Sequence, residues 1–347
     1  MSLRGRLTID LDAVIANWRA LDAESSETSE TAAVLKADAY GLGAERVGQA
    51  LSGIGIRTFF VAVAAEGESL RGAVGPDAAI YILGGYSRDS VARYRTHDLR
   101  PVLNSAAQAA AWFSDQPGAP AAIQLDTGMN RLGMEAAEFA SLGPLPDSIT
   151  MVMSHAGCAD EPDHGLNGVQ LSEFLRLTEG IGRQRSLAAT AGILLGPDWH
   201  FDLTRPGIGL YGGLPFREAR PVVRLDAPII QIREVLPGEH VGYGASWAVE
   251  RPARIATVSI GYADGLIRAC SNRARAFIDG QPVPFAGRVS MDLITLDVTG
   301  LDCAAGDMVE ILGANQTIDD LAKTGGTIGH EILTSLGHRY QREYQGG

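Results

Sequence analysis

Lysine is rare in this chain, because among 29 lysines and arginines only Lys36 and Lys323 are lysine. Lys36 lies in an apolar run, preceded by Val34 and Leu35 and followed by Ala37. An arginine cannot lose its proton in a protein, whereas a partly buried lysine can become a neutral nucleophile and form a Schiff base. The alternative is a lysine at a strand end whose stem packs on apolar residues while its ammonium reaches water. The scarcity of lysine and the apolar neighbours together favour the chemical role.

Short apolar, β-branched or aromatic runs recur through the first two-thirds of the chain and predict the strands that position Lys36. These runs are Ala33–Leu35, Phe59–Val63, Ile80–Leu83, Pro101–Leu103, Ala121–Leu125, Ile149–Ser154, Ser186–Ala189 and Gly207–Tyr211. Helical patterns fill several of the gaps, at Ala44–Leu51, Ser105–Phe113 and Val169–Ile181. Strands that alternate with helices in this way most simply form a (β/α)8 barrel of the α/β class. An open, doubly wound sheet is the alternative.

From about residue 220 onward the pattern changes to strands joined by glycine, proline and aspartate turns. The predicted strands are Ile229–Val235, Ile255–Ile260, Ala276–Ile278, Val283–Phe285, Ile294–Val298 and Met308–Leu312, with short helices at Thr317–Lys323 and Ile328–Leu336. This pattern is typical of a mostly antiparallel β domain. We therefore expect a barrel over residues 10–222 and a β domain over residues 223–347. The alternating segment 5–11 is expected to join the β domain.

The overall composition excludes several classes of function. A length of 347 residues suits two domains. A formal net charge of −12, with scattered arginines, offers no basic surface for nucleic acid. We find neither a signal peptide nor a run of about 18 apolar residues, so we expect a soluble, cytoplasmic protein without a membrane segment. The three cysteines lack the spacing of a disulfide framework or a zinc site, so no metal is expected.

Polar and basic residues gather where the predicted barrel strands end, which is where barrels of this kind carry their function. Lys36 follows the first strand, His155 the sixth and Thr190 the seventh, and Arg205 and Gly207 lie around the eighth. This set suits a phosphate-bearing cofactor that is held covalently. Lys36 would supply the imine, Thr190 with the backbone amides of Gly207 and Ile208 could hold a phosphate, and Arg205 could face a ring nitrogen.

Five segments, taken together and in the order in which they occur along the chain, carry the strongest evidence for function. They are Val34–Gly43, Leu125–Gly133, Arg205–Gly212, Val241–Trp247 and Gly287–Asp292. In sequence and spacing these segments resemble motifs of the alanine racemase family, and the first resembles that family's pyridoxal phosphate attachment motif. The resemblance extends from Leu7 almost to the C-terminus. It implies a barrel followed by a β domain, in a homodimeric isomerase that interconverts L-alanine and D-alanine with pyridoxal 5'-phosphate.

The resemblance also implies a role for each matching residue. Lys36 would hold the cofactor and act as acid/base on one face of the substrate Cα, and Tyr243 of the partner subunit would act on the other face. Two groups are required because a single base would return the proton to the face it came from. The further matches are Arg131 and the partner subunit's Met291 for the substrate, Tyr40, Thr190, Gly207 and Ile208 for the phosphate, Arg205 for the pyridine nitrogen, and His155 as the partner of Arg205.

Two positions depart from the family pattern. Many members have a carbamylated lysine that faces the counterpart of Arg131, whereas this chain has Gln124, whose amide oxygen we expect to accept a hydrogen bond from Arg131. Near the C-terminus the family often has a tyrosine that contacts the phosphate and orients the catalytic tyrosine. This chain offers His338 or Tyr340 for that role, and an alignment without gaps favours His338.

Three other functions compete with this interpretation. A broad-specificity amino acid racemase would share the same residues, and the sequence does not define the pocket volume that separates it from an alanine enzyme. A barrel-type amino acid decarboxylase usually has an acidic partner for the pyridine nitrogen, where this chain has Arg205. A non-enzymatic carrier of pyridoxal phosphate would lack a second domain with an acid/base such as Tyr243. Whether the enzyme serves D-alanine biosynthesis or alanine catabolism is left open by the sequence.

Overall fold

The structure is a computed structural model that describes residues 4–347. Its contacts divide the chain into two compact units, each described here by itself. The barrel unit contains residues 14–210 and 215–219 together with Gly347, and the β unit contains residues 211–214 and 220–346 together with the N-terminal residues up to Ala13.

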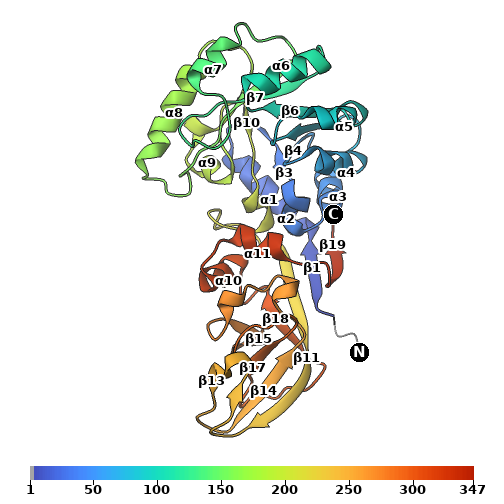
Figure 1. Cartoon of the computed structure of the whole chain (residues 1–347), viewed down its shortest axis with the longest axis vertical. Helices are drawn as coiled ribbons and strands as arrows, with labels where there is room; N and C mark the ends of the chain where they lie inside the picture. Colours follow the sequence, from blue (N-terminus) through green and yellow to red (C-terminus); the bar gives the residue numbers. More distant parts are fainter. Residues whose placement is uncertain (1–3) are drawn as a thin grey trace. The chain divides into compact units, whose positions relative to one another are not determined.

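The barrel unit is built on a seven-stranded parallel sheet in which neighbouring strands are consecutive in sequence (Figure 1). The strands are β3 (Ala33–Val34), β4 (Thr58–Val61), β5 (Ala79–Ile82), β6 (Leu99–Leu103), β7 (Ala121–Gln124), β8 (Ile149–Met153) and β9 (Gln184–Ser186). All residues of β4, β5 and β7 are buried. Burial of both faces is expected of a parallel sheet, because crossover helices cover it. The predicted alternation of strands and helices is confirmed.

The crossover helices lie between the strands in the chain. They are α1 (Leu11–Glu24), α2 (Lys36–Gly41), α3 (Ala44–Gly53), α4 (Ala64–Val74), α5 (Val91–Thr96), α6 (Ala106–Asp115), α7 (Ala136–Ser141), α8 (Gly165–Thr178) and α9 (Thr190–Leu194). Ser105 ends its extended segment as the N-cap of α6, where its side chain accepts a hydrogen bond from the Gln108 amide. Such a cap satisfies one of the amides that a helix start leaves unpaired.

A short eighth strand, β10 (Leu203–Thr204), closes the ring. On one side β10 pairs in parallel with β2 (Glu30–Thr31), and the pairing continues as the Val34 amide donates to the Pro206 carbonyl at 3.0 Å. On the other side the Arg205 amide donates to the Ala188 carbonyl at 2.8 Å. The predicted (β/α)8 architecture is therefore confirmed, with its last strand in a different place.

The predicted strand at Gly207–Tyr211 is wrong, because Ile208–Tyr211 forms a 3-10 turn. Apolar residues at 208 and 210 alternate as in a strand, but two apolar residues two apart fit a tight helical turn equally well. The true strand has only two residues, which is too short for any periodicity.

The β unit contains an eight-stranded sheet whose central path runs β16-β15-β18-β11-β1-β19, with β14 pairing with β11 and β17. The bounds are β1 (Arg6–Asp10), β11 (Val223–Val235), β14 (Ala253–Val258), β15 (Arg275–Ile278), β16 (Gln281–Pro284), β17 (Ile294–Asp297), β18 (Met308–Leu312) and β19 (Gln341–Gln345), with helices α10 (Ile318–Gly325) and α11 (Gly329–Ser335). The N-terminal strand β1 pairs antiparallel with β11 and parallel with β19. Leu7 and Ile9 of β1 are fully buried, as its alternating pattern requires.

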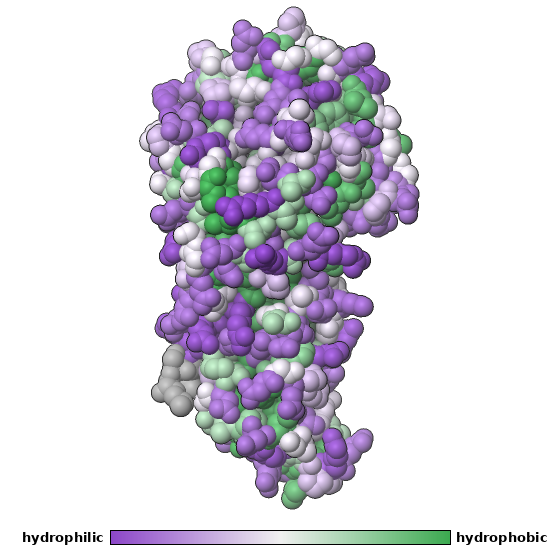
Figure 2. Space-filling view, turned by 180° about the vertical axis from the view of Figure 1, so that it is seen from behind, coloured by the Kyte–Doolittle hydropathy of each residue, from purple (hydrophilic) through white to green (hydrophobic). Residues whose placement is uncertain are grey.

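On the face shown in Figure 2, hydrophilic side chains predominate on both units and apolar ones are interspersed among them. Within residues 4–347, none of the helices is long and apolar enough to cross a membrane.

Candidate active site

Lys36 begins a strained turn directly after β3. The next four residues, Ala37, Asp38, Ala39 and Tyr40, all have left-handed backbone angles, with φ of 54°, 55°, 52° and 56°. A left-handed conformation costs an L-residue about 1–2 kcal/mol. Four in succession are rare, and such strain persists only where the surroundings impose it.

Two carboxylates hold this turn in place. Asp38 accepts a hydrogen bond from the Ala44 amide at 2.7 Å and so joins the end of the turn to the start of α3. Glu66, in the first turn of α4, accepts a hydrogen bond from the Ala37 amide at 2.8 Å. Sequence reasoning missed Glu66, because only the second half of the capping-box pattern is present: Glu66 stands three residues after the N-cap, but the N-cap residue is Val63 rather than a serine or threonine.

The surroundings of Lys36 favour its neutral form. Burial lowers the pKa of Lys36, and the positive charges of Arg131 and Arg205 lower it further. The Glu66 carboxylate opposes this shift and raises the Lys36 pKa. A larger fraction of this amine is therefore unprotonated, and nucleophilic, than for a lysine in water.

Arg205 follows β10 and is almost completely buried, with 3% of its surface exposed. Its guanidinium donates to the Ser186 hydroxyl and to the carbonyls of Ser154 at 2.7 Å and Leu187 at 3.3 Å. Its Cζ lies 5.9 Å from the centre of the Phe60 ring. No carboxylate pairs with Arg205 among the residues that the structure describes. Burial lowers the pKa of Arg205 to about 9, so the group is still a cation at neutral pH.

His155 follows β8 and is neutral at physiological pH. Burial lowers its pKa to about 3, and the charges of Arg205, Arg131 and Lys36 contribute in that order. In the described part of the chain, Arg205 donates to the carbonyl of Ser154, and no hydrogen bond joins it to the His155 ring. The positive charge of Arg205 therefore acts on His155 by disfavouring protonation of its ring.

A cluster of hydroxyls and glycines lies beside the closing strand. The buried Thr190 hydroxyl, at the start of α9, accepts hydrogen bonds from the amides of Gly207 at 3.0 Å and Gly209 at 3.3 Å. A Cβ at position 207 would collide with the Tyr40 hydroxyl, and one at position 209 would lie 2.7 Å from Thr190 Cγ2. Burial raises the pKa of Tyr40, which keeps its hydroxyl a neutral donor. Ile208, also buried, begins the 3-10 turn.

Arg131 lies in a loop that leaves β7 and returns to it. The Asp126 carboxylate accepts hydrogen bonds from the amides of Gly128, Met129 and Asn130 at 2.8, 3.0 and 3.1 Å. Arg131 itself is exposed. Across residues 4–347 no hydrogen bond joins Arg131 to Gln124, whose amide group donates instead to the Leu132 carbonyl at 3.2 Å. The expected acceptor role of Gln124 toward Arg131 is therefore not seen. The Gln124 side chain instead binds the backbone of the loop, at Leu132.

Tyr243 and Met291 belong to the β unit, where both side chains are exposed, by 71% and 54%. Tyr243 lies at the turn between β12 (His240–Val241) and β13 (Trp247–Ala248). This turn packs closely on the segment before Met291, because a Cβ at Gly244 would lie 3.0 Å from the Arg288 guanidinium. The exposed phenol and thioether are thus available to another molecule.

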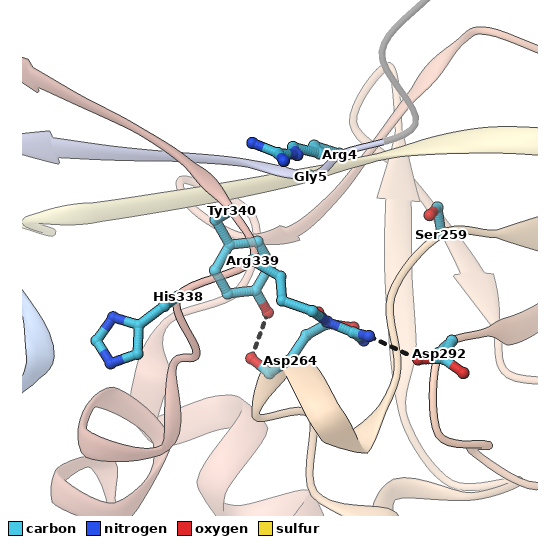
Figure 3. A pocket seen from close by; sticks show the side chains of 8 residues that line it. All are labelled: Arg4, Gly5, Ser259, Asp264, Asp292, His338, Arg339 and Tyr340. Carbon is cyan, nitrogen blue, oxygen red and sulfur yellow. Dashed lines mark hydrogen bonds and ion pairs between the residues drawn. The ribbon is translucent and has the colours of Figure 1, made fainter.

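A pocket of about 390 Å³ in the β unit is organised by Arg339 (Figure 3). Its guanidinium binds both oxygens of buried Asp264, at 2.6 and 2.7 Å, and Asp292 at 2.7 Å. The Tyr340 hydroxyl donates to the Asp264 carbonyl at 2.6 Å. His338 is exposed and points away from this cluster in Figure 3. Of the two candidates for the C-terminal phosphate contact, Tyr340 is therefore already engaged within the β unit.

The predicted site residues thus fall into two groups. Within the barrel unit the structure brings Arg131 and Arg205 near Lys36 and His155, whose pKa values their charges lower, and it places Tyr40, Thr190, Gly207 and Ile208 in one cluster. Tyr243 and Met291 lie in the β unit.

Comparisons with known proteins cover both units. A family model described as the alanine racemase N-terminal domain matches residues 9–215, and one described as the C-terminal domain matches residues 222–344. The chain is 54% identical to an alanine racemase of Cereibacter sphaeroides over 97% of each chain, and 55% identical to that of Dinoroseobacter shibae over 98% of each.

Solved structures agree with these relatives. The chain is similar to an alanine racemase from Bartonella henselae with covalently bound pyridoxal phosphate, at 37% identity and a TM-score of 0.94 over 99% of this chain and 100% of that one. A biosynthetic alanine racemase from Pseudomonas aeruginosa is 36% identical, with a TM-score of 0.92 over 99% and 100% of the two chains.

The close approach of Tyr40 to Gly207 generates a prediction. Gly207→Ala should force the Tyr40 hydroxyl away and lower the free energy of unfolding by about 1–3 kcal/mol, as overpacking of a core does. The measurement is urea unfolding. Gly168→Ala is the matched control, because Gly168 is exposed in α8 with open space around it and the change should be neutral or stabilising. Equal stability of Gly207→Ala and the parent would contradict the packing described here.

Proposed function

Because this chain belongs to the alanine racemase family, we propose that it is an isomerase that interconverts L-alanine and D-alanine and uses pyridoxal 5'-phosphate. The observation that carries the proposal is the Lys36 amine, which is partly buried and whose pKa is lowered by that burial and by the charges of Arg131 and Arg205. This is the amine that the chemistry requires.

The residues of the barrel unit fit the cofactor. Tyr40 and Thr190 offer hydroxyl donors suited to a phosphate, beside the Gly207 amide that donates to Thr190, at a place where a Cβ on residue 207 would leave no room. Buried Arg205 supports a neutral ring nitrogen, since no described carboxylate neutralises its charge and a guanidinium can only donate. When bound, pyridoxal phosphate condenses with amino groups and withdraws electrons from the substrate Cα, which makes its proton acidic.

We assign the two acid/base roles to Lys36 and to Tyr243 of the partner subunit. A neutral Lys36 amine can accept the Cα proton on one face, and a phenol can donate a proton to the opposite face, so that the configuration inverts. What supports the second role is the 71% exposure of Tyr243 in the β unit, where its hydroxyl is available to a second copy of the chain. We propose a homodimer whose sites each combine residues of both subunits, with the partner subunit's Met291 against the substrate.

Arg205 and His155 determine which reaction follows. Arg205 can only donate a hydrogen bond, so it disfavours protonation of the ring nitrogen and limits how far charge spreads from the substrate Cα. A neutral His155 adds no positive charge to this environment, since its pKa is about 3. Decarboxylases with an acidic partner at this nitrogen favour the opposite outcome, so we regard a decarboxylase as the weaker alternative.

The substrate carboxylate is assigned to Arg131, because its guanidinium is exposed at the end of its loop and suits a bidentate contact. We further propose that residues 10–222 hold the cofactor, that residues 223–347 with segment 5–11 supply Tyr243, and that the enzyme acts in the cytoplasm in D-alanine biosynthesis. With Tyr340 engaged by Asp264, His338 is the proposed C-terminal contact to the phosphate.

To test the proposal, L-alanine is incubated with the purified holoenzyme in deuterated water, and both the deuterium content at Cα and the chirality of alanine are measured over time. We expect deuterium to enter at Cα together with formation of D-alanine. L-serine and L-valine serve as side-chain controls, and equal turnover of all three would favour a broad-specificity racemase. Release of carbon dioxide would identify a decarboxylase. Tight cofactor binding without exchange or inversion would identify a carrier protein.

The two lysines of the chain allow a paired prediction. Borohydride treatment of the holoenzyme should attach the cofactor to Lys36, and peptide mapping should find none on Lys323. Lys36→Arg should abolish this attachment and lower racemisation by at least about 10²- to 10⁴-fold, because a guanidinium cannot act as a base. Lys323→Arg, at an exposed position of α10, should keep both the attachment to Lys36 and the racemase activity. Attachment to Lys323 would refute the assignment.

The second acid/base is tested with Tyr243→Phe. Loss of one face-specific proton donor should lower kcat by about 10²- to 10⁴-fold while the cofactor stays bound. Tyr344→Phe, on edge strand β19, is the matched control and should retain the activity of the parent. The measurements are turnover in both directions and cofactor absorbance. Full activity of Tyr243→Phe in both directions would require another group on that face.

A further inference from the structure

We propose that Glu66 is a positioning residue for Lys36, which ties the turn that carries this lysine to the end of β4 and supplies the negative charge that balances two nearby arginines. The proposal rests on the proposed function of Lys36 as the reactive amine. It concerns a residue outside the segments that resemble the family motifs.

The two oxygens of Glu66 bind different strand ends. One oxygen accepts hydrogen bonds from the amides of Ala62 at 2.7 Å and Val63 at 3.3 Å, directly after β4. The other accepts the Ala37 amide at 2.8 Å, directly after Lys36. Strands β3 and β4 are parallel neighbours, with Val34 opposite Phe60. A single carboxylate therefore bridges the carboxyl ends of two adjacent strands.

Helix capping explains only half of this arrangement. A glutamate in the first helical turn that reaches back to the N-cap amide is a common way to begin a helix, and Glu66 does so at Val63. The bond to Ala37 crosses 29 residues of sequence. This bond gives an acceptor to the Ala37 amide, where the left-handed turn begins. Within the turn, the Ala39 amide donates to the Leu35 carbonyl. Without Glu66 the exposed Ala37 amide would lose this hydrogen-bond acceptor, at the most strained part of the site.

The charges around Lys36 come from several elements. Arg131 after β7 and Arg205 after β10 both lower the Lys36 pKa, and Glu66 on α4 is the carboxylate that raises it. His155 after β8 is neutral, with its pKa at about 3, and Asp38 is engaged by the Ala44 amide. No ion pair joins Glu66 and Lys36 within the described chain, so this effect acts through space. An acid/base must hold as well as release its proton, and Glu66 keeps that balance.

The test uses the full chain freed of cofactor, so that it does not depend on racemisation. The rate at which an amine reagent labels Lys36 is measured against pH by peptide mass spectrometry, with exposed Lys323 as an internal reference. Glu66→Gln should move the Lys36 midpoint down by roughly 0.5 to 1 pH unit, because loss of an anion disfavours the ammonium. The Lys323 midpoint should not move.

Backbone hydrogen exchange of the peptide that contains Ala37 reports the second role. Glu66→Gln should increase its exchange, because an amide side chain can accept from only one strand end and presents N–H groups to the other. Glu66→Asp retains the charge but has a shorter reach, so exchange should rise while the labelling midpoint stays near that of the parent. If Glu66→Gln does not fold, Glu66→Asp still decides the tether through exchange.

Asp320→Asn is the matched control, since Asp320 is a first-turn carboxylate whose side chain, among residues 4–347, binds only Thr317 at the start of α10. It should change neither readout at Lys36. The proposal is overturned if Glu66→Gln leaves both the midpoint and the exchange as in the parent, or if Asp320→Asn shifts them equally. Absence of deuterium exchange into alanine by the parent would instead refute the proposed function, which separates the two failures.

Discussion

The site depends on the hydrogen bonds by which the two-residue strand β10 closes the barrel. The bond from the Val34 amide to the Pro206 carbonyl joins the strand that carries Lys36 to the segment that carries Arg205 and Gly207. Closure also places Thr190, after β9, against the Gly207 amide. An open sheet would leave these residues at opposite edges. The arrangement of side chains around Lys36 is thus a consequence of completing the ring.

Holding these residues in place costs conformational and electrostatic free energy. Four left-handed residues after Lys36 store strain, and a buried guanidinium at Arg205 has no described carboxylate to neutralise it. The structure offsets these costs with polar groups, since Asp38 and Glu66 bind backbone amides of the turn while Ser186 and two carbonyls accept from Arg205. Polar groups held by several hydrogen bonds keep a single geometry, which is what acid/base chemistry needs.

In the β unit, ion pairs and hydrogen bonds hold an exposed loop in one conformation. Arg339 joins Asp264 and Asp292, and the amides of Tyr262 and Ala263 donate to the carbonyls of Ser290 and Met291. These bonds order the loop that presents Met291 while leaving its side chain exposed. An ordered, exposed apolar side chain suits contact with a second molecule better than a mobile one, because less entropy is lost when it binds.

Local signals in the sequence predicted the class of fold and the order of most strands, through apolar periodicity and turn residues, and they singled out Lys36 as a candidate because it is a rare amine among apolar neighbours. The sequence also placed Arg205 and Thr190 near strand ends. It could not locate β10, which is too short to show a period, and it gave Gly207–Tyr211 the wrong conformation. The Glu66 bond to Ala37 and the engagement of Gln124 with Leu132 were decided only by tertiary structure. Such bonds depend on where the closed ring and its loops bring side chains and backbone together, and no local pattern records that.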